Sequence, residues 1–187
     1  GDAMRIDASF KPELLTADDG RRALTGLSLE PAKKRLVVSN GKAIMLFPVV
    51  DVDEDSPGII PVDALKEARK VAKTIHTSDA CLCVNGLVEV EGPGTKRTFD
   101  KVDGTFPEAE AVLRTHDLNS KRTVRISINA YLLADMAKAA ASKHGEVHLT
   151  FKVDKYGDST LEPVEISIPH CDIIKAMVMP MTTLPQR

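Results

Sequence analysis

One order of elements, a strand followed by a helix and then several short strands, constrains this chain more than any single motif. A strand at residues 58–61 leads into residues 62–75, where apolar side chains recur at the helical period of 3.6. Short apolar segments at 80–84, 87–91 and 96–99 follow, and Asn-Gly between the first two is a strong hairpin signal. The pattern predicts an α+β fold in which antiparallel sheets carry helices on one face.

The same order returns in the second half of the sequence. An alternating strand at 123–128 precedes a helix that Asn129 can cap. Four apolar side chains of this helix share one face and are expected in a core, namely Leu132, Leu133, Met136 and Ala140. Further strands are predicted at 146–153, 164–168 and 173–179.

The N-terminal region repeats the order without its helix. Residues 10–20 contain Pro12 and end in Asp-Asp-Gly, so they are too short and too broken for an ordinary helix. We therefore predict two domains. Residues 1–115 form a domain whose first helix is shortened or missing, and residues 116–187 form a second, partial unit.

Composition excludes several classes of protein. The net charge of −2 and the pI near 6.2 do not suit a chain held on nucleic acid by its overall charge, although a local basic surface remains open. The sequence has no apolar run long enough to span a bilayer and no secretory signal pattern, so we expect a cytoplasmic protein without a membrane partner. Cys81 and Cys83 lie in an apolar strand and are expected to be buried and reduced.

Several short motifs resemble those of the bacterial sliding clamp, the beta subunit of DNA polymerase III. They stand in the same order as in that family and span most of the chain. The matching stretches are Arg-Ala-Leu-Thr-Gly-Leu-Ser-Leu at 22–29, Val-Val-Ser-Asn-Gly-Lys-Ala-Ile at 37–44, Ile-Ile-Pro at 59–61, Val-Asp-Gly-Thr-Phe-Pro at 102–107 and Val-Met-Pro-Met at 178–181. The last two are the most specific.

The resemblance implies a DNA clamp fold and a non-catalytic role in DNA replication. Family members form a ring around duplex DNA and keep a DNA polymerase on its template, so the implied partners are duplex DNA and peptides of the polymerase and the clamp loader. One chain of this length cannot surround a duplex, so the resemblance also implies a homo-oligomer. The alternative is a clamp-derived interaction module that binds replication proteins without encircling DNA, which the shortened first unit favours.

A clamp must present cations to phosphates without reading bases. Four basic residues of the predicted helix at 62–75 have the spacing of a single stripe opposite the apolar one, namely Lys66, Arg69, Lys70 and Lys73. In the second helix Lys138 is the candidate, on a face that is otherwise nearly neutral. The same spacing of basic residues is also typical of an ordinary solvated helix face. The prediction of DNA contact therefore rests on the family resemblance as well as on the spacing.

The family also has a pocket that receives short peptides of its partners. At matching positions this pocket would contain Leu24, Ser39, Gly41, Lys42, Ile44, Val178, Met179, Pro180 and Met181. Ala43 departs from the pattern, because the family has a basic residue there. The methionines suit an adaptable pocket, and they equally suit the end of a sheet core.

The sequence favours no enzymatic reading. It contains no phosphate-binding glycine loop of the P-loop type, and its five histidines lack the spacing of metal ligands. We therefore predict no cofactor, no metal and no catalytic residue.

Overall fold

The structure is a computed structural model that describes residues 3–18, 20–114, 127–139, 145–152, 163–168 and 176–180. The chain divides into two compact units, residues 1–115 and residues 116–187. No helix in the described ranges is long and apolar enough to cross a membrane.

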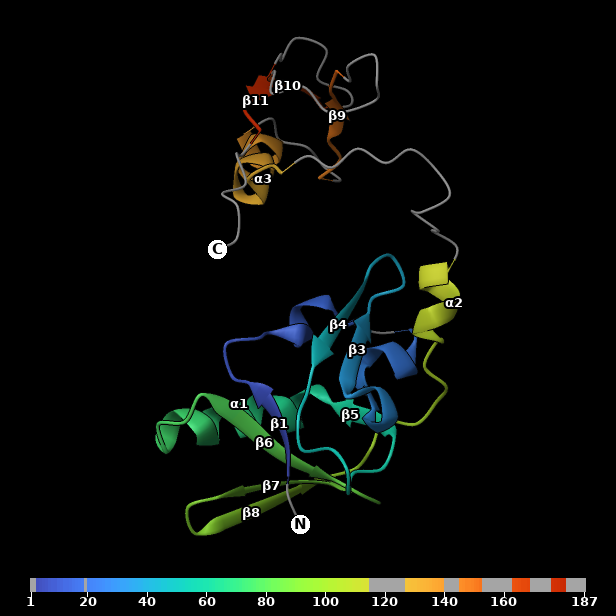
Figure 1. The fold of residues 1–187 in the computed structure, drawn as a ribbon, viewed down its shortest axis with the longest axis vertical. Helices are drawn as coiled ribbons and strands as arrows, with labels where there is room; N and C mark the ends of the chain where they lie inside the picture. The colour runs from blue at the N-terminus through green and yellow to red at the C-terminus, as the bar shows by residue number, and fades with distance from the viewer. Residues whose placement is uncertain are drawn as a thin grey trace. The chain divides into compact units, whose positions relative to one another are not determined.

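Two four-stranded antiparallel sheets build the first unit (Figure 1). One has the order β4-β3-β2-β5, with β2 at Gly26–Glu30, β3 at Arg35–Ser39, β4 at Ile44–Pro48 and β5 at Gly58–Pro61. The other has the order β1-β6-β7-β8, with β1 at Met4–Asp7, β6 at Asp79–Val84, β7 at Val88–Gly92 and β8 at Thr95–Phe99. An isolated bridge between Arg5 and Val50 joins β1 to the segment after β4.

Helix α1, at Val62–Thr74, packs against β6 and β7 and lies alongside β6 in Figure 1. It buries Ala64, Leu65, Ala68 and Ala72, the apolar positions that recur at the helical period. Ala64, Leu65 and Ala68 join one hydrophobic core with alternate residues of β1, β6 and β7 and with residues of β2, β3 and β5. The predicted fold class, an α+β fold in which antiparallel sheets carry helices, is confirmed.

A short 3-10 helix, η1 at Pro12–Leu15, stands where the other copies of the pattern have a full helix. The sequence left open a shortened or a missing helix at this place, and the structure has these four residues of 3-10 helix. Two more 3-10 helices, η2 at Arg22–Thr25 and η3 at Pro31–Lys33, flank β2. A short helix that the sequence pattern did not predict, α2 at Ala109–Arg114, follows the last strand of the unit.

The second unit contains helix α3, at Ala130–Ala139, and an antiparallel sheet of order β11-β10-β9. The strands are β9 at His148–Thr150, β10 at Val164–Ser167 and β11 at Ala176–Val178. Asn129 caps α3 as predicted, because its Oδ1 accepts a hydrogen bond from Tyr131 N at 3.0 Å. Leu133 and Met136 pack on the sheet core, but Leu132 is 44% exposed and the prediction of a core position for it is wrong. The predicted strand at 123–128 falls largely outside the described residues, and so does the predicted core residue Ala140.

The expected burial of the two strand cysteines is also wrong. Ala80, Leu82 and Val84 face the core from β6, so the alternation of a strand turns Cys81 and Cys83 to the opposite face. Cys81 is exposed, Cys83 is partly buried, and both are free thiols.

Gly26 in β2 lies very close to β5, so that a side chain at this position would collide with β5. A Cβ at this position would lie 2.6 Å from Ile59 Cγ2 and 2.7 Å from the Ile60 carbonyl oxygen, and backbone cannot yield as a flexible side chain can. We expect Gly26→Ala to lower the free energy of unfolding by about 1–3 kcal/mol, measured by urea denaturation followed by circular dichroism. Gly86→Ala is the matched control, because no atom lies within 4 Å of its Cβ position. Equal stability of the two variants would contradict the close packing.

Candidate nucleic-acid and peptide interfaces

Three lysines of α1 form an exposed row on the side of the helix away from the core. Lys66, Lys70 and Lys73 are exposed, and none of them makes an ion pair within the part of the chain that the structure describes. Their positive charges are therefore available to an external anion.

Arg69 belongs to the same predicted stripe but has a different environment. Its guanidinium donates a hydrogen bond to the Phe10 carbonyl oxygen at 3.0 Å and forms an ion pair with Glu13 of η1. Only 16% of its side chain is exposed. Arg69 therefore holds η1 against α1, and we assign it this structural role instead of the predicted phosphate contact.

The opposite edge of α1 is tied to β8. Glu67 is 18% exposed and pairs with Arg97 at 3.4 Å, so an ion pair lies on each side of the lysine row. These ion pairs connect both edges of the exposed helix face to neighbouring elements, so the orientation of the three lysines relative to the unit is fixed. Lys138 is exposed on α3, in the second unit.

The five residues of the first unit that were predicted to line a partner-peptide pocket do line one pocket. Its volume is about 240 Å³, and it is formed by Arg21, Leu24, Ser39, Gly41, Lys42, Ala43, Ile44 and Pro107. Val178, Met179 and Pro180 belong to the second unit, and Met181 lies outside the described residues. Their contribution to a peptide site stays a prediction.

The turn between β3 and β4 shapes one wall of the pocket. Ser39 Oγ accepts a hydrogen bond from Gly41 N at 3.0 Å, and Asn40 Oδ1 accepts from both Lys42 N and Ala43 N at 2.9 Å. Gly41 has a φ of 84°, in the left-handed region that favours glycine. Side chains of the Ser-Asn-Gly sequence thus satisfy the backbone donors of the turn.

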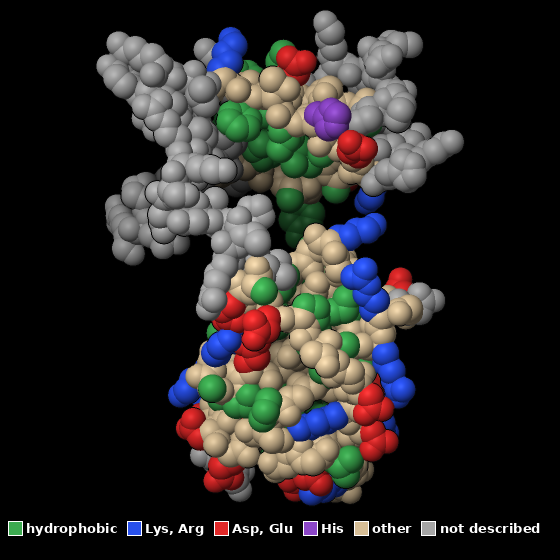
Figure 2. Space-filling view, turned by 90° about the vertical axis from the view of Figure 1, so that its right-hand side faces the viewer, with side chains coloured by type: hydrophobic (Ala, Val, Ile, Leu, Met, Phe, Trp, Pro, Cys, Tyr) green, Lys and Arg blue, Asp and Glu red, His purple; other side chains and the backbone are tan. Residues whose placement is uncertain are grey.

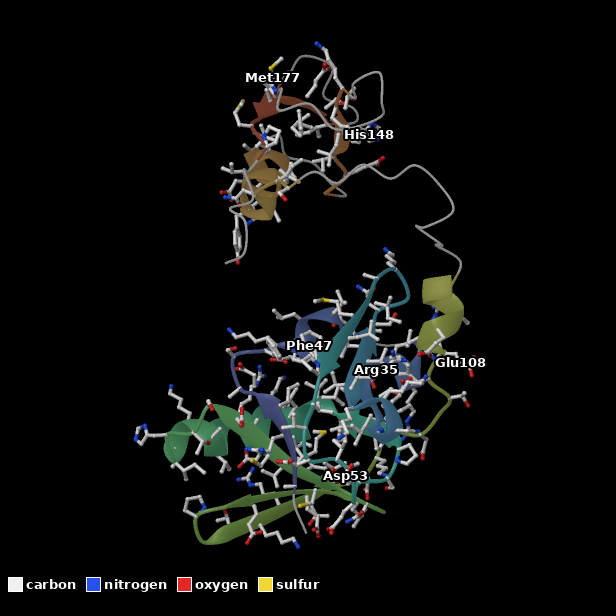
Figure 3. All side chains as sticks on the ribbon, in the orientation of Figure 1. Arg35, Phe47, Asp53, Glu108, His148 and Met177 are labelled. Carbon is white, nitrogen blue, oxygen red and sulfur yellow. The ribbon has the colours of Figure 1, made fainter. Side chains whose placement is uncertain are left out.

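The segment that carries Pro107 is attached to the same sheet. Val102 N donates to the Ile59 carbonyl oxygen at 2.9 Å, and Gly104, with a φ of 125°, lies against Ala23. Beyond Pro107, Glu110 of α2 pairs with Lys33 at 2.8 Å and with Arg35 at 2.6 Å. Figure 3 shows Arg35 on β3 and Glu108 at the start of the neighbouring α2 segment.

Three residues that line the pocket were not among those predicted from the sequence, namely Arg21, Ala43 and Pro107. Pro107 is the last residue of the Val-Asp-Gly-Thr-Phe-Pro motif, so its motif was a usable signal. Arg22 was taken as the basic residue of its motif, yet it pairs with Asp103 at 3.5 Å in solvent, whereas Arg21 lines the pocket. Because Arg21 and Arg22 are adjacent and of the same type, the sequence alone does not indicate which of them lines the pocket.

Outside the lysine row, charges of both signs are mixed. Figure 2 shows Lys and Arg side chains interspersed with Asp and Glu on the face of the first unit that it presents. In the acidic segment at 51–55, Asp51 pairs with Arg5, and one Asp55 carboxylate oxygen accepts a hydrogen bond from Val84 N at 2.6 Å. Burial raises the pKa of Asp55. These acids therefore serve the fold of the unit.

No metal centre with three or more ligands is found in the described ranges. No three His, Cys, Asp or Glu side chains within them are arranged to hold a metal ion. The two features that stand out are an electropositive helix face and a small, largely apolar pocket.

Comparison with solved structures identifies the fold. The chain superposes on a DnaN sliding clamp, DNA polymerase III subunit beta, from Bartonella birtlesii bound to griselimycin, with a TM-score of 0.62 and 18% identity over 98% of this chain and 52% of that one. The DNA polymerase sliding clamp from Pseudomonas aeruginosa gives a TM-score of 0.62 and 17% identity over 96% of this chain and 52% of that one. The subunit from Thermotoga maritima gives 0.51 and 17%, over 98% and 66%.

The chain therefore has the fold of the bacterial sliding clamps, and the predicted resemblance is confirmed at the level of fold. It spans about half the length of the Bartonella and Pseudomonas clamps. No protein-family model matches the sequence, and no curated protein matches it either.

The ion pairs of Glu110 predict how the stability of the first unit depends on pH. Hydrogen bonds from Lys33 and then from Arg35 lower the pKa of Glu110 to about 2, from an ordinary value of 4.5. A lowered pKa in the folded state stabilises the fold above the unfolded value, and this contribution is lost as the pH falls from about 4.5 towards 2. We expect Glu110→Gln to reduce the fall in thermal unfolding midpoint across this range.

The control for Glu110 is Glu108→Gln, which removes an exposed carboxylate two residues away. This variant should keep the acid sensitivity of the wild type. An unchanged profile for Glu110→Gln would show that its ion pairs do not couple protonation to folding.

Arg69 and Lys70 provide a matched pair for separating structural from exposed cations. Arg69→Gln leaves Glu13 largely buried without its partner, so we expect a loss of roughly 2–4 kcal/mol in the free energy of unfolding. Lys70→Gln removes the same charge from an exposed position and should change this free energy by less than about 0.5 kcal/mol. Urea denaturation of both variants measures the difference, and a stable Arg69→Gln would contradict the structural role of Arg69.

Proposed function

We propose that this chain is a sliding-clamp-like DNA-binding protein, a non-catalytic processivity factor that tethers a DNA polymerase to duplex DNA. The observation that carries the proposal is the row of three exposed lysines on α1, which form no ion pair with any described residue, in a chain with the clamp fold. Lysines of this kind bind the phosphate backbone of any sequence, because they neutralise phosphates and release counterions. Contacts without base readout suit a protein that must move along DNA.

The pocket supplies the second half of the proposed activity. Leu24 and Ile44 offer apolar surface beside the ordered turn at 39–43, which suits a short peptide of a polymerase or a clamp loader. A peptide held there would raise the local concentration of the polymerase on DNA that the same protein encloses. The proposal includes a homo-oligomer, because enclosing a duplex takes more clamp-fold units than these 187 residues provide.

The alternative is an interaction module with the clamp fold that binds replication proteins without encircling DNA. The short η1 favours it, because a full helix in that place would offer a second inward-facing surface for cations. This alternative needs the pocket but does not need a ring.

Retention on closed DNA distinguishes the two functions. A ring assembled on nicked circular DNA should remain bound through a wash with high salt and should be lost after the circle is cut, because its hold is topological. A module would be lost from circular and linear DNA alike. Loss from both forms would therefore overturn the encircling function and leave the alternative.

The lysine row generates a quantitative prediction. The variant Lys66→Gln/Lys70→Gln/Lys73→Gln should weaken binding to a random duplex, and the slope of log K against log salt should fall in magnitude by about 2 to 3, or about 0.9 for each lost phosphate contact. Fluorescence anisotropy at several salt concentrations measures this slope.

Lys34→Gln/Lys96→Gln is the control, because Lys34 lies by Asp53 and Lys96 pairs with Glu89. Its salt slope should match the wild type. An equal slope for the triple variant would exclude the α1 row as the DNA surface.

A further inference from the structure

Two cysteines of β6 lie on the face of the β1-β6-β7-β8 sheet that is turned away from the hydrophobic core. Cys81 and Cys83 are two residues apart, so their side chains point to the same side of the strand. Cys81 is exposed, Cys83 is partly buried, and both are free thiols. Neither belongs to the α1 lysine row or lines the pocket. The pair is therefore a feature that the proposed function does not use.

The spacing of the two thiols is fixed by the sheet. Strand β6 lies between two antiparallel neighbours, with Cys81 paired with Arg5 of β1 and Cys83 paired with Glu89 of β7. A strand rises about 3.3 Å per residue, which places the two Cβ atoms about 6.6 Å apart. Because both neighbours hold the strand extended, this distance cannot shorten much without breaking hydrogen bonds of the sheet.

This separation is too long for a disulfide and suits a bridging ion. The Cβ atoms of a disulfide lie about 3.8 Å apart, and its S–S bond is about 2.05 Å long. Two sulfur–metal bonds of about 2.3 Å each, arranged in a line, are about 2.5 Å longer than that S–S bond. The bridged Cβ atoms would then be about 6.3 Å apart, close to the spacing on the strand. The folded sheet therefore excludes the disulfide and admits a linear S–metal–S link.

The number of ligands restricts the ion. Within the described ranges no three His, Cys, Asp or Glu side chains are arranged to hold a metal, so an ion at this place must be satisfied by two sulfurs. Zinc takes at least three protein ligands, and magnesium and calcium require oxygen. Among biological metals Cu(I) is the soft ion that thiolates select, and it accepts two of them in a linear arrangement.

The surroundings of the pair suit a cation and disfavour other thiol chemistry. The charged side chains nearby are Arg5 and Lys96 against Asp51, Asp79 and Glu89, an excess of negative charge that attracts a metal ion. Desolvation raises the pKa of both thiols, so they are protonated at neutral pH and react slowly as nucleophiles. An ion with high affinity for sulfur can still displace the two protons.

We propose that Cys81 and Cys83 form a two-coordinate binding site for Cu(I) on the sheet surface of the first unit. Binding forms two Cu–S bonds, breaks two S–H bonds and releases two protons to solvent. Copper stays in its +1 state throughout, so no oxidant or reductant takes part. The site does not depend on the proposed function, because it lies on the face of β6 opposite to α1. An adduct of the exposed Cys81 thiol alone is the competing outcome.

Anaerobic titration of Cu(I) in competition with the chromogenic chelator bicinchoninate tests the site. The full chain carries Cys171→Ser, so that the two cysteines of β6 are its only thiols. We expect it to withdraw one Cu(I) per chain from the chelator. Cys81→Ser and Cys83→Ser in this background should each lose the uptake, because one thiolate leaves the ion half coordinated. The matched control, Glu89→Gln, removes the carboxylate opposite Cys83 and should keep one Cu(I) per chain.

Two further measurements examine the geometry. Copper X-ray absorption of the loaded protein should show two sulfur neighbours and no oxygen neighbour. Treatment of the copper-free Cys171→Ser chain with diamide, followed by alkylation and mass spectrometry, should leave both thiols free in the folded protein. The same treatment in urea should close the disulfide, because the unfolded chain no longer holds the two residues apart. Circular dichroism checks that the serine variants are folded.

Each contrary result removes a specific part of the inference. No uptake of Cu(I) from the chelator by the Cys171→Ser chain would overturn the site. Uptake that persists in Cys81→Ser or in Cys83→Ser would overturn the bridge and indicate an adduct of a single thiol. Loss of uptake in Glu89→Gln would overturn two-coordinate binding, and rapid disulfide formation in the folded protein would overturn the spacing on which the bridge depends.

Discussion

The packing of α1 on its sheet is the constraint on which the proposed DNA surface depends. Ala64, Leu65, Ala68 and Ala72 must be buried together, and this fixes the rotation of the helix about its axis. The environment of each polar residue of α1 then depends on its angular position around the helix axis. Glu67 and Arg69 lie next to the buried stripe, reach neighbouring elements and form ion pairs, whereas Lys66, Lys70 and Lys73 project into solvent. Burial of the apolar face therefore determines which basic residues are exposed.

The pocket depends on a different constraint, because its residues come from three separate segments. The loop before β2, the turn between β3 and β4, and the segment after β8 must meet. The turn is held by its own Ser and Asn side chains, while the third segment is attached by Val102 near its start and Glu110 beyond Pro107. The charges of Glu110, Lys33 and Arg35 therefore serve the pocket without touching it.

Elements governed by local chemistry were predictable from the sequence. Asn-Gly between apolar stretches gives the β6–β7 hairpin, Asn129 caps α3, and Pro12 with the Asp-Asp-Gly stretch limits the first helix to η1. The errors have a common cause in contacts between distant residues. Helical spacing places Arg69 with the lysines, but its partner Glu13 lies 56 residues earlier. Cys81 and Cys83 compete for burial with Ala80, Leu82 and Val84, and only packing on α1 decides which face of the strand is covered.

Under the proposed function, the two interfaces would respond differently to salt. DNA binding through the α1 lysines would be governed by counterion release, so it would be weak, independent of sequence and sensitive to salt. Peptide binding in the pocket would combine burial of apolar surface, which salt does not weaken, with the charges of Arg21 and Lys42. Under the proposed function, the protein would therefore move along DNA while it holds its partner. The net charge of −2 conceals this arrangement, because several cations of the first unit are neutralised in ion pairs, whereas the three lysines of the α1 row form no ion pair with the described residues.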